Sequence, residues 1–269
     1  MSLRYRLEGA GDVTVVLVHE MAGCIESWDR IAPVIAGHCR VLRYDQRGFG
    51  LSEKVARLSF DDMVNDLVGL LDALDLREPV FLAGCALGAA LCLGTAHRHA
   101  DRVSGLLLSS PATGGMTAAA RARMEDWLQQ VVDSGMRAIT DRMFAVTYPE
   151  KLPVDPMDRE QHRLRWLSAD PESFIALNRM LFDLDLDPIL GSVTTPALLV
   201  GCRADAVRSP EAVRGIAAKM PRAAYREVDS GHYFPLQSPH LFASVLLDWL
   251  ANTRVNGELA GLRNSALKE

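Results

Sequence analysis

Short apolar runs alternate with longer amphipathic stretches through the first part of the chain. Val13–Val18 is a nearly continuous β-branched run, which is typical of a strand covered on both faces. Phe60–Leu74 has acidic residues at its start and an apolar stripe at helical spacing, so it predicts an amphipathic helix. Further strands are predicted at Val41–Tyr44, Pro79–Ala83 and Val103–Ser109. Repeated strand–helix units with short connections predict an α/β fold with a doubly wound, mostly parallel sheet.

The pattern changes after Pro111, where apolar strand-like runs stop for about 75 residues and only helical stretches follow. Strands resume at Ala197–Gly201 and Ala224–Val228, and a closing helix is predicted at Phe242–Leu250, before a polar, frayed tail from Asn252. We therefore predict a core formed by residues 1–112 and 189–269, with residues 113–188 inserted as a helical cap over the strand ends. The alternative is a second domain packed to one side, but so short a segment seldom builds a core of its own.

Composition narrows the classes of partner. The chain has 269 residues, a net charge of −5 and no cluster of Lys or Arg, so no nucleic acid partner is expected. No apolar run approaches the length that spans a bilayer, and the N-terminus lacks a signal-peptide core, so no membrane partner is expected either. The five cysteines show no metal-ligand spacing and suit a reducing, cytoplasmic location. The sequence does not indicate the oligomeric state, and it is compatible with a homo-oligomer.

The most informative segment is Gly84-Cys85-Ala86-Leu87-Gly88, which follows a predicted strand and precedes a predicted helix. A strand ending in G-x-S-x-G before a helix is a nucleophile elbow, in which the glycines allow strand and helix to approach closely. Here the nucleophile position holds Ala86, and a methyl group cannot attack a carbonyl. Cys85 carries a nucleophilic atom but stands one position too early in the turn.

Two further residues complete a candidate triad. His232 follows the last predicted strand, and histidine is the residue type that most often serves as a general base near neutral pH. Asp205 lies after the strand Ala197–Gly201, where its carboxylate would orient the imidazole. The order nucleophile, acid, base is that of α/β-hydrolases. The loop after the first central strand would supply one backbone N–H of an oxyanion hole from Met21, and Leu87 would supply the other.

With these residues in view, the chain resembles the α/β-hydrolase family, and within it the 3-oxoadipate enol-lactonase type of small-molecule hydrolases. The resemblance covers nearly the whole chain and rests on Leu17-Val18-His19, Trp28, the run from Tyr44 to Ser52, Asp66–Leu74, the elbow, Val193–Pro196, Asp205 and His232. It implies an enzyme that hydrolyses a small ester, lactone or amide of an organic acid through an acyl-enzyme. It implies neither a metal nor an organic cofactor.

Two departures from the family pattern stand out. Glu20 stands where the family usually has a glycine after His19. Its carboxylate is either a solvated side chain or a group that touches the substrate. Ala86 has three explanations, and the one we favour is an engineered serine-to-alanine change, because Asp205, His232 and both elbow glycines are intact. The others are a natural pseudoenzyme that binds a ligand, and a lyase or cofactor-free oxygenase that uses the His–Asp pair as a base.

Candidate substrate contacts come from the cap. Trp127 and Trp166 lie in amphipathic stretches and could line the pocket, although packing of the cap explains them equally well. Arg163 could bind a carboxylate of the substrate, against the default of a solvated surface arginine. The predicted partner is thus a small-molecule substrate.

Overall fold

A seven-stranded sheet forms the centre of the protein. The computed structural model describes residues 2–265. Its strands lie in the spatial order β1-β3-β2-β4-β5-β6-β7, and all neighbours are parallel except β1, which pairs antiparallel with β3. The bounds are β1 Tyr5–Glu8, β2 Thr14–Val18, β3 Arg40–Tyr44, β4 Val80–Cys85, β5 Val103–Ser109, β6 Ala197–Cys202 and β7 Ala223–Val228. The predicted doubly wound, mostly parallel α/β sheet is confirmed.

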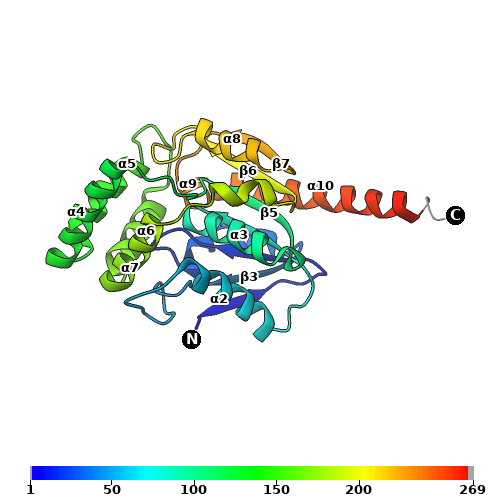
Figure 1. Cartoon of the computed structure of the whole chain (residues 1–269), viewed down its shortest axis with the longest axis horizontal. Coiled ribbons are helices and arrows are strands. Elements are labelled where there is room, and N and C mark those ends of the chain that lie inside the picture. The colour runs from blue at the N-terminus through cyan, green and yellow to red at the C-terminus, as the bar shows by residue number, and fades with distance from the viewer. Residues whose placement is uncertain (1, 266–269) are drawn as a thin grey trace.

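Helices cover both faces of this sheet (Figure 1). Alternate strand residues face opposite ways, so Val16 and Val18 contribute to one apolar core while Val15 and Leu17 contribute to the other. The first core includes residues of α2 (Phe60–Ala73), α3 (Leu87–Arg98) and α8 (Pro210–Lys219). The second includes residues of α1 (Ala32–Ile35) and α10 (Pro239–Ser265). Two short helical turns, η1 (Ile25–Trp28) and α9 (Phe234–Gln237), add buried residues to the core, while η2 (Ala100–Arg102) has none.

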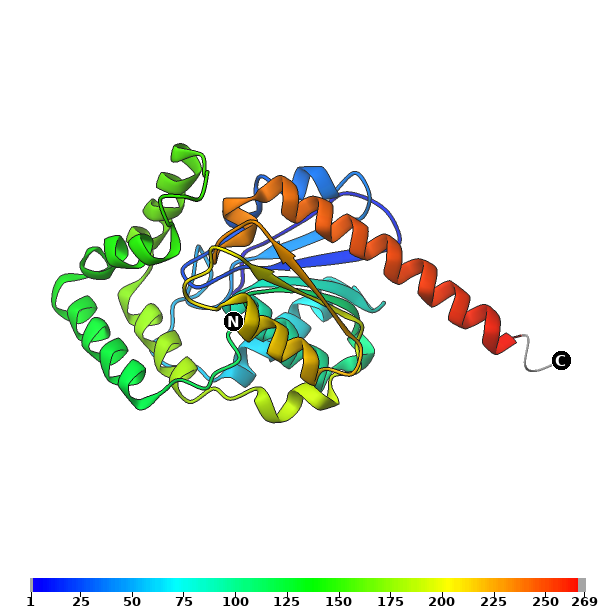
Figure 2. The ribbon, with the colours of Figure 1, turned by 90° about the horizontal axis from the view of Figure 1, so that it is seen from above.

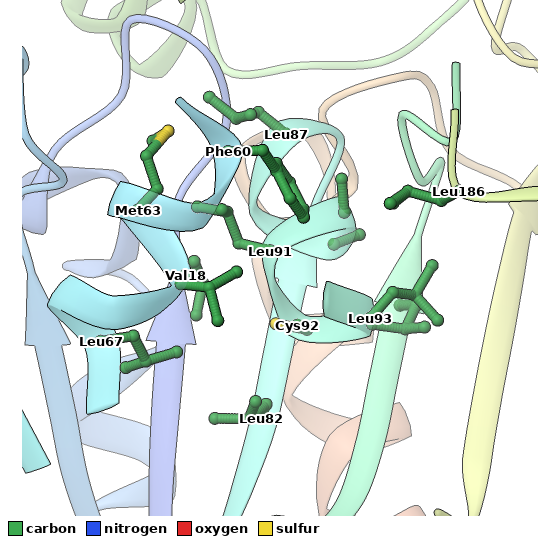
Figure 3. Packing of buried hydrophobic residues seen from close by; sticks show 14 of the residues in the cluster. Val18, Phe60, Met63, Leu67, Leu82, Leu87, Leu91, Cys92, Leu93 and Leu186 are labelled. Atoms are coloured by element: carbon green, nitrogen blue, oxygen red, sulfur yellow. The ribbon is translucent and has the colours of Figure 1, made fainter. Parts of the chain in front are cut away.

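The packing around the middle of α3 fixes that helix against α2 and the sheet. Figure 3 shows Phe60 of α2 and Leu91 of α3 close together, above Leu82 of β4. A Cβ added to Gly94 would stand 2.4 Å from the ring of Phe60, so this position needs a residue without a side chain. Close packing here holds α3, and with it the turn between β4 and α3, in one place.

The segment between β5 and β6 forms a separate group of helices. It contains α4 (Ala118–Ser134), α5 (Arg137–Thr147), α6 (Pro156–Ser168), α7 (Pro171–Phe182) and η3 (Asp187–Ser192). Helices α4–α7 lie together at one end of the molecule, and α10 runs away from the opposite end (Figures 1 and 2). The two ends of the segment meet where Gly114 bridges Asp185 and Leu186 N–H donates to the carbonyl of Thr113, at 2.9 Å. We refer to α4–α7 as the cap helices.

Three elements differ from the sequence-based predictions. The edge strand β1 was not predicted, because three of its four residues are exposed and it has no buried apolar run. Residues Trp28–Ile35 have the apolar spacing of one helix, but η1 ends at Trp28 and α1 begins only at Ala32. The closing helix begins at Pro239 and continues to Ser265, so the frayed tail predicted from Asn252 is wrong for residues 252–265, and residues 266–269 lie outside the described part. Within residues 2–265, no helix combines the length and apolar character that crossing a bilayer requires.

Candidate active site

The turn that joins β4 to α3 has the geometry of a strained elbow. Ala86 lies in this turn with φ 51° and ψ −111°, a conformation that residues with a side chain seldom adopt. Its N–H donates to the carbonyl of Ser109 at 3.0 Å, and its own carbonyl accepts from Ala112 N–H at 3.1 Å. A Cβ on Gly88 would stand 2.0 Å from the carbonyl oxygen of Val18, so helix and strand meet here only because that side chain is absent. The turn therefore presents residue 86 at the carboxyl end of the central strands.

An imidazole and a carboxylate are paired beside this turn. The Nδ1 atom of His232 lies 3.0 and 3.1 Å from the two carboxylate oxygens of Asp205. Ser110 Oγ donates to the same carboxylate at 2.6 Å, and the backbone N–H groups of Val207 and Arg208 donate to it at 2.8 Å. Burial alone would raise the pKa of Asp205, but the hydrogen bonds and charge of His232, with the bonds from Ser110 and Arg208, hold that pKa below its ordinary value. The carboxylate is thus kept ionised and aimed at the imidazole.

Hydrogen bonds tie the loop that carries the imidazole to the elbow and to the segment after β6. The Cys85 thiol donates to the carbonyl of His232 at 3.4 Å, and Ala204 N–H donates to the carbonyl of Ser230 at 2.9 Å. Burial, with the charge of Glu20 adding, raises the pKa of the Cys85 thiol well above its ordinary value. Cys85 is consequently a protonated, inward-facing group that holds two loops together, and it cannot substitute as a nucleophile at neutral pH.

The loop after β2 is fixed by the imidazole of His19. Its Nδ1 lies 2.8 Å from the carbonyl of Glu20, and its Nε2 accepts from Gln46 N–H at 3.0 Å, which assigns the proton to Nδ1. Burial lowers the pKa of His19, so the ring is neutral and suits this bonding. The backbone N–H groups of Met21 and Leu87 donate no hydrogen bond among the described residues. No acceptor among the described residues therefore competes for these two groups, which the sequence predicted as oxyanion donors.

The other predicted contact residues lie in different surroundings. Glu20 is fully buried and accepts from Ser27 Oγ at 2.9 Å, so it is not a solvated side chain. Trp166 is buried among Phe144 and Phe174 of the cap helices, and Trp127 is half-buried against the same apolar core. Arg163 is bonded to Asp141 and Glu160 on α5 and α6. Its guanidinium is therefore already paired with two carboxylates.

One group of side chains has the types that bind metal ions. Ligand atoms of Cys24, Glu26 and Asp45 lie within 4.8 Å of one another. The guanidinium of Arg4 bonds to both carboxylates, however, and Asp45 also accepts from the N–H groups of Ile25 and Leu51. Because these oxygens already have donors and a cation beside them, the group is an ion-pair network that fixes the N-terminal strand.

Sequence reasoning missed two residues near the candidate triad. Ser110 lies just after β5 with φ 48°, and its only sequence signal is its place after a strand that neighbours β4 and β6. His162 of α6 is fully buried and stands four positions before Trp166, so both lie on one face of that helix. That shared face is the signal by which His162 could have been found.

Comparison with known proteins agrees with this architecture. Residues 15–245 match the family described as the alpha/beta hydrolase family. The putative carbamate hydrolase RutD of Pantoea ananatis is 25% identical over 250 residues, which cover 90% of each chain. The enol-lactonase from Burkholderia xenovorans LB400 is 25% identical with a TM-score of 0.84, covering 93% of this chain and 96% of that one. A thermophilic esterase from Thermogutta terrifontis shares the fold, with a TM-score of 0.87 and 24% identity over 93% of each chain.

Proposed function

Because this chain belongs to the alpha/beta hydrolase family, we propose that its site is built to hydrolyse a small ester, lactone or amide of an organic acid. The observation that carries the proposal is the strained backbone of residue 86 beside a fully bonded His232–Asp205 pair. A protein that only bound a ligand would need neither feature. The relatives support the class of reaction, since they include a putative carbamate hydrolase and an enol-lactonase.

For a chain with Ala86→Ser, the proposed mechanism is acyl transfer in two steps. The introduced hydroxyl attacks the substrate carbonyl, His232 takes its proton, and the N–H groups of Met21 and Leu87 hold the oxyanion. The bond to the leaving group then breaks, and His232 passes the proton to that group. Water, deprotonated by His232, attacks the acyl-enzyme. His232 then returns that proton to the oxygen of residue 86 as the acid leaves, which restores the free enzyme. Asp205 stays ionised and stabilises the imidazolium in both steps.

With alanine at position 86, the first step has no nucleophile. The chain as it stands is proposed to bind the substrate without forming an acyl-enzyme. The engineered replacement and a natural pseudoenzyme both fit this description of the site, because they differ in the origin of Ala86 and not in its chemistry.

A second function is favoured by one observation, the complete His232–Asp205 pair in a chain that lacks the nucleophile. A base of this kind can remove a proton from carbon next to a carbonyl, or activate water directly. Lyase or cofactor-free oxygenase chemistry would need the pair and not a residue 86 hydroxyl. Such activity would be present with Ala86 and absent in His232→Ala.

The test is a rate comparison on a panel of nitrophenyl esters, lactones and carbamates. Ala86→Ser should hydrolyse at least one class faster than the Ala86 chain, by between about 10³-fold and 10⁶-fold, where the upper value is the cost of losing the serine in a comparable triad. Adding His232→Ala to Ala86→Ser is the matched control and should return the rate to background. No gain on any substrate would refute the acyl-transfer proposal.

The proposed partner is a small molecule, and a cytoplasmic location stays a prediction from composition.

A further inference from the structure

A second polar group lies beside the candidate triad and takes no part in the mechanism above. Glu20 is fully buried, and while its Oε1 accepts from Ser27, its Oε2 has no hydrogen-bond partner among the described residues. The carboxylate fits only because Gly23 has no side chain, since a Cβ there would stand 2.6 Å from Glu20 Oε1. Burying a carboxylate with an unsatisfied oxygen is costly, so the lone oxygen of Glu20 calls for a specific explanation.

The cap supplies the other half of this group. His162 of α6 is fully buried, and its Nε2 lies 3.6 Å from Glu20 Oε1, too far for a hydrogen bond. Burial, reinforced by the positive charges of Arg165 and His232, lowers the pKa of His162 well below its ordinary value, so the ring is neutral. Its Nδ1 lies 2.7 Å from Tyr148 Oη.

The surroundings of His162 assign its tautomer. A proton on Nε2 avoids placing a lone pair against the Glu20 carboxylate, and Nδ1 then accepts from the Tyr148 hydroxyl. The buried pair therefore offers one acceptor, Glu20 Oε2, and one donor, His162 Nε2–H. Neither atom has a hydrogen-bond partner within the described part of the chain.

This pair lies next to the candidate triad. Val18 of β2 pairs with Gly84 of β4, so Glu20 and Ala86 each leave the sheet two residues further on, at neighbouring positions. The ring of Tyr233 packs against both His162 of the buried pair and His232 of the candidate triad. Its centroid is 4.7 Å from that of His162 and 4.9 Å from that of His232, edge-on to both.

We propose that Glu20 and His162 form a second subsite that binds a substrate group which both donates and accepts a hydrogen bond. The inference rests on the proposed function, which assigns the carbonyl that reacts at residue 86. It adds which chemical group the substrate carries away from that carbonyl. A hydroxyl or a primary amide matches one acceptor and one donor. A carboxylate has only acceptors and would be repelled by Glu20, so the substrate that fits carries no free carboxylate at this end.

The experiment measures binding to the Ala86 chain, which does not turn the ligands over by acyl transfer. Calorimetry measures the dissociation constants of two pairs of esters. Methyl succinamate, which carries a primary amide, is compared with dimethyl succinate. Methyl 3-hydroxybutanoate, which carries a hydroxyl, is compared with methyl butanoate. Monomethyl succinate tests the carboxylate. At least one donor-bearing ester should bind about 10-fold tighter than its partner, because hydrogen bonds to a charged group are among the stronger ones.

Glu20→Gln keeps the size of the side chain but loses the charge, and it should reduce this preference about 10-fold. The matched control is Glu160→Gln, which removes the same charge from an exposed position of α6 and should keep the preference. If Glu20→Gln fails to fold, His162→Phe provides the second variant and should also lose the preference.

Equal affinities within each pair, a preference that survives Glu20→Gln, or tightest binding of monomethyl succinate would each overturn the subsite. The outcome is separate from that of the proposed function. Absence of hydrolysis by Ala86→Ser would refute acyl transfer and leave these affinities to decide the subsite.

Discussion

At the scale of single residues, the orientation of Asp205 depends on donors from three segments. His232 donates from the loop after β7, Ser110 from the segment after β5, and the N–H groups of Val207 and Arg208 from the chain that follows Asp205 itself. Each donor favours the ionised carboxylate. Together they fix both the charge and the direction of the group that aims the imidazole.

We predict that Ser110→Ala lowers kcat/KM about 10-fold in the Ala86→Ser background, because a hydrogen bond to a charged group is worth about 1.5–3 kcal/mol. The loss of this donor also moves the pKa of Asp205 back toward its ordinary value. A lowered pKa gives stability that is present above the unfolded pKa and is lost as the pH falls through the folded one. The destabilisation by Ser110→Ala, measured by urea unfolding, should thus be full at pH 7 and fade below about pH 3.9.

Ser109→Ala is the matched control, since Ser109 Oγ is 3.4 Å from the carbonyl of Gly84 and does not touch Asp205. An equal loss of activity in both variants would contradict the role given to Ser110. The sequence alone indicated Asp205 and His232 through their places after two strands. It could not indicate Ser110, because a serine after a strand has no pattern that distinguishes a carboxylate donor from a turn residue.

At the scale of elements, α3 and β2 meet through backbone contact rather than through side chains. Gly88 faces the carbonyls of Val18 and His19, both within 2.6 Å of where its Cβ would lie. This contact sets how far α3 enters the carboxyl edge of the sheet. It therefore sets where the elbow presents residue 86.

We expect Gly88→Ala to destabilise the fold by about 3 kcal/mol or more, because backbone atoms cannot move aside as a flexible side chain would. Gly69→Ala in α2 is the control, since its Cβ would meet nothing within 4 Å. It should stabilise the protein by about 0.5–1 kcal/mol through helix propensity. Free energies of unfolding in denaturant measure both changes, and a tolerated Gly88→Ala would contradict the packing described.

The elements that the sequence predicted are those with a strong apolar pattern. Runs of apolar residues predicted the buried strands, and an apolar stripe at helical spacing predicted α2. The edge strand β1 and the far part of α10 do not, because β1 is mostly exposed and the polar residues after Asn252 carry no apolar stripe. The G-x-x-x-G spacing located the elbow because the backbone itself requires those two glycines.

At the scale of the whole molecule, the cap helices are joined to the core beside the imidazole loop. The buried amide of Gln237 in α9 donates to the carbonyl of Thr147 at the end of α5, at 2.7 Å. It also accepts from Tyr233 N–H at 2.8 Å. One side chain thus satisfies a cap carbonyl and a backbone donor next to His232. Contacts of this kind join residues 90 positions apart and could not be predicted from a local pattern.

We predict that Gln237→Leu costs about 2–4 kcal/mol, because two buried backbone groups lose their partner. Amide hydrogen exchange should rise in α5 and in residues 231–234 more than in the central strands. The exposed Gln129→Leu in α4 should change stability by less than about 0.5 kcal/mol. Unchanged exchange at the end of α5 in Gln237→Leu would show that the amide does not hold the cap to the core.

The central claim is that residue 86, His232 and Asp205 form one reactive site. The most direct measurement is labelling with a fluorophosphonate, in which a hydroxyl at position 86 displaces fluoride from phosphorus while His232 takes the proton. Peptide mass spectrometry should find one adduct on residue 86 of Ala86→Ser, and none in the Ala86 chain or after adding His232→Ala. No adduct on Ala86→Ser, or labelling that does not depend on His232, would contradict the account.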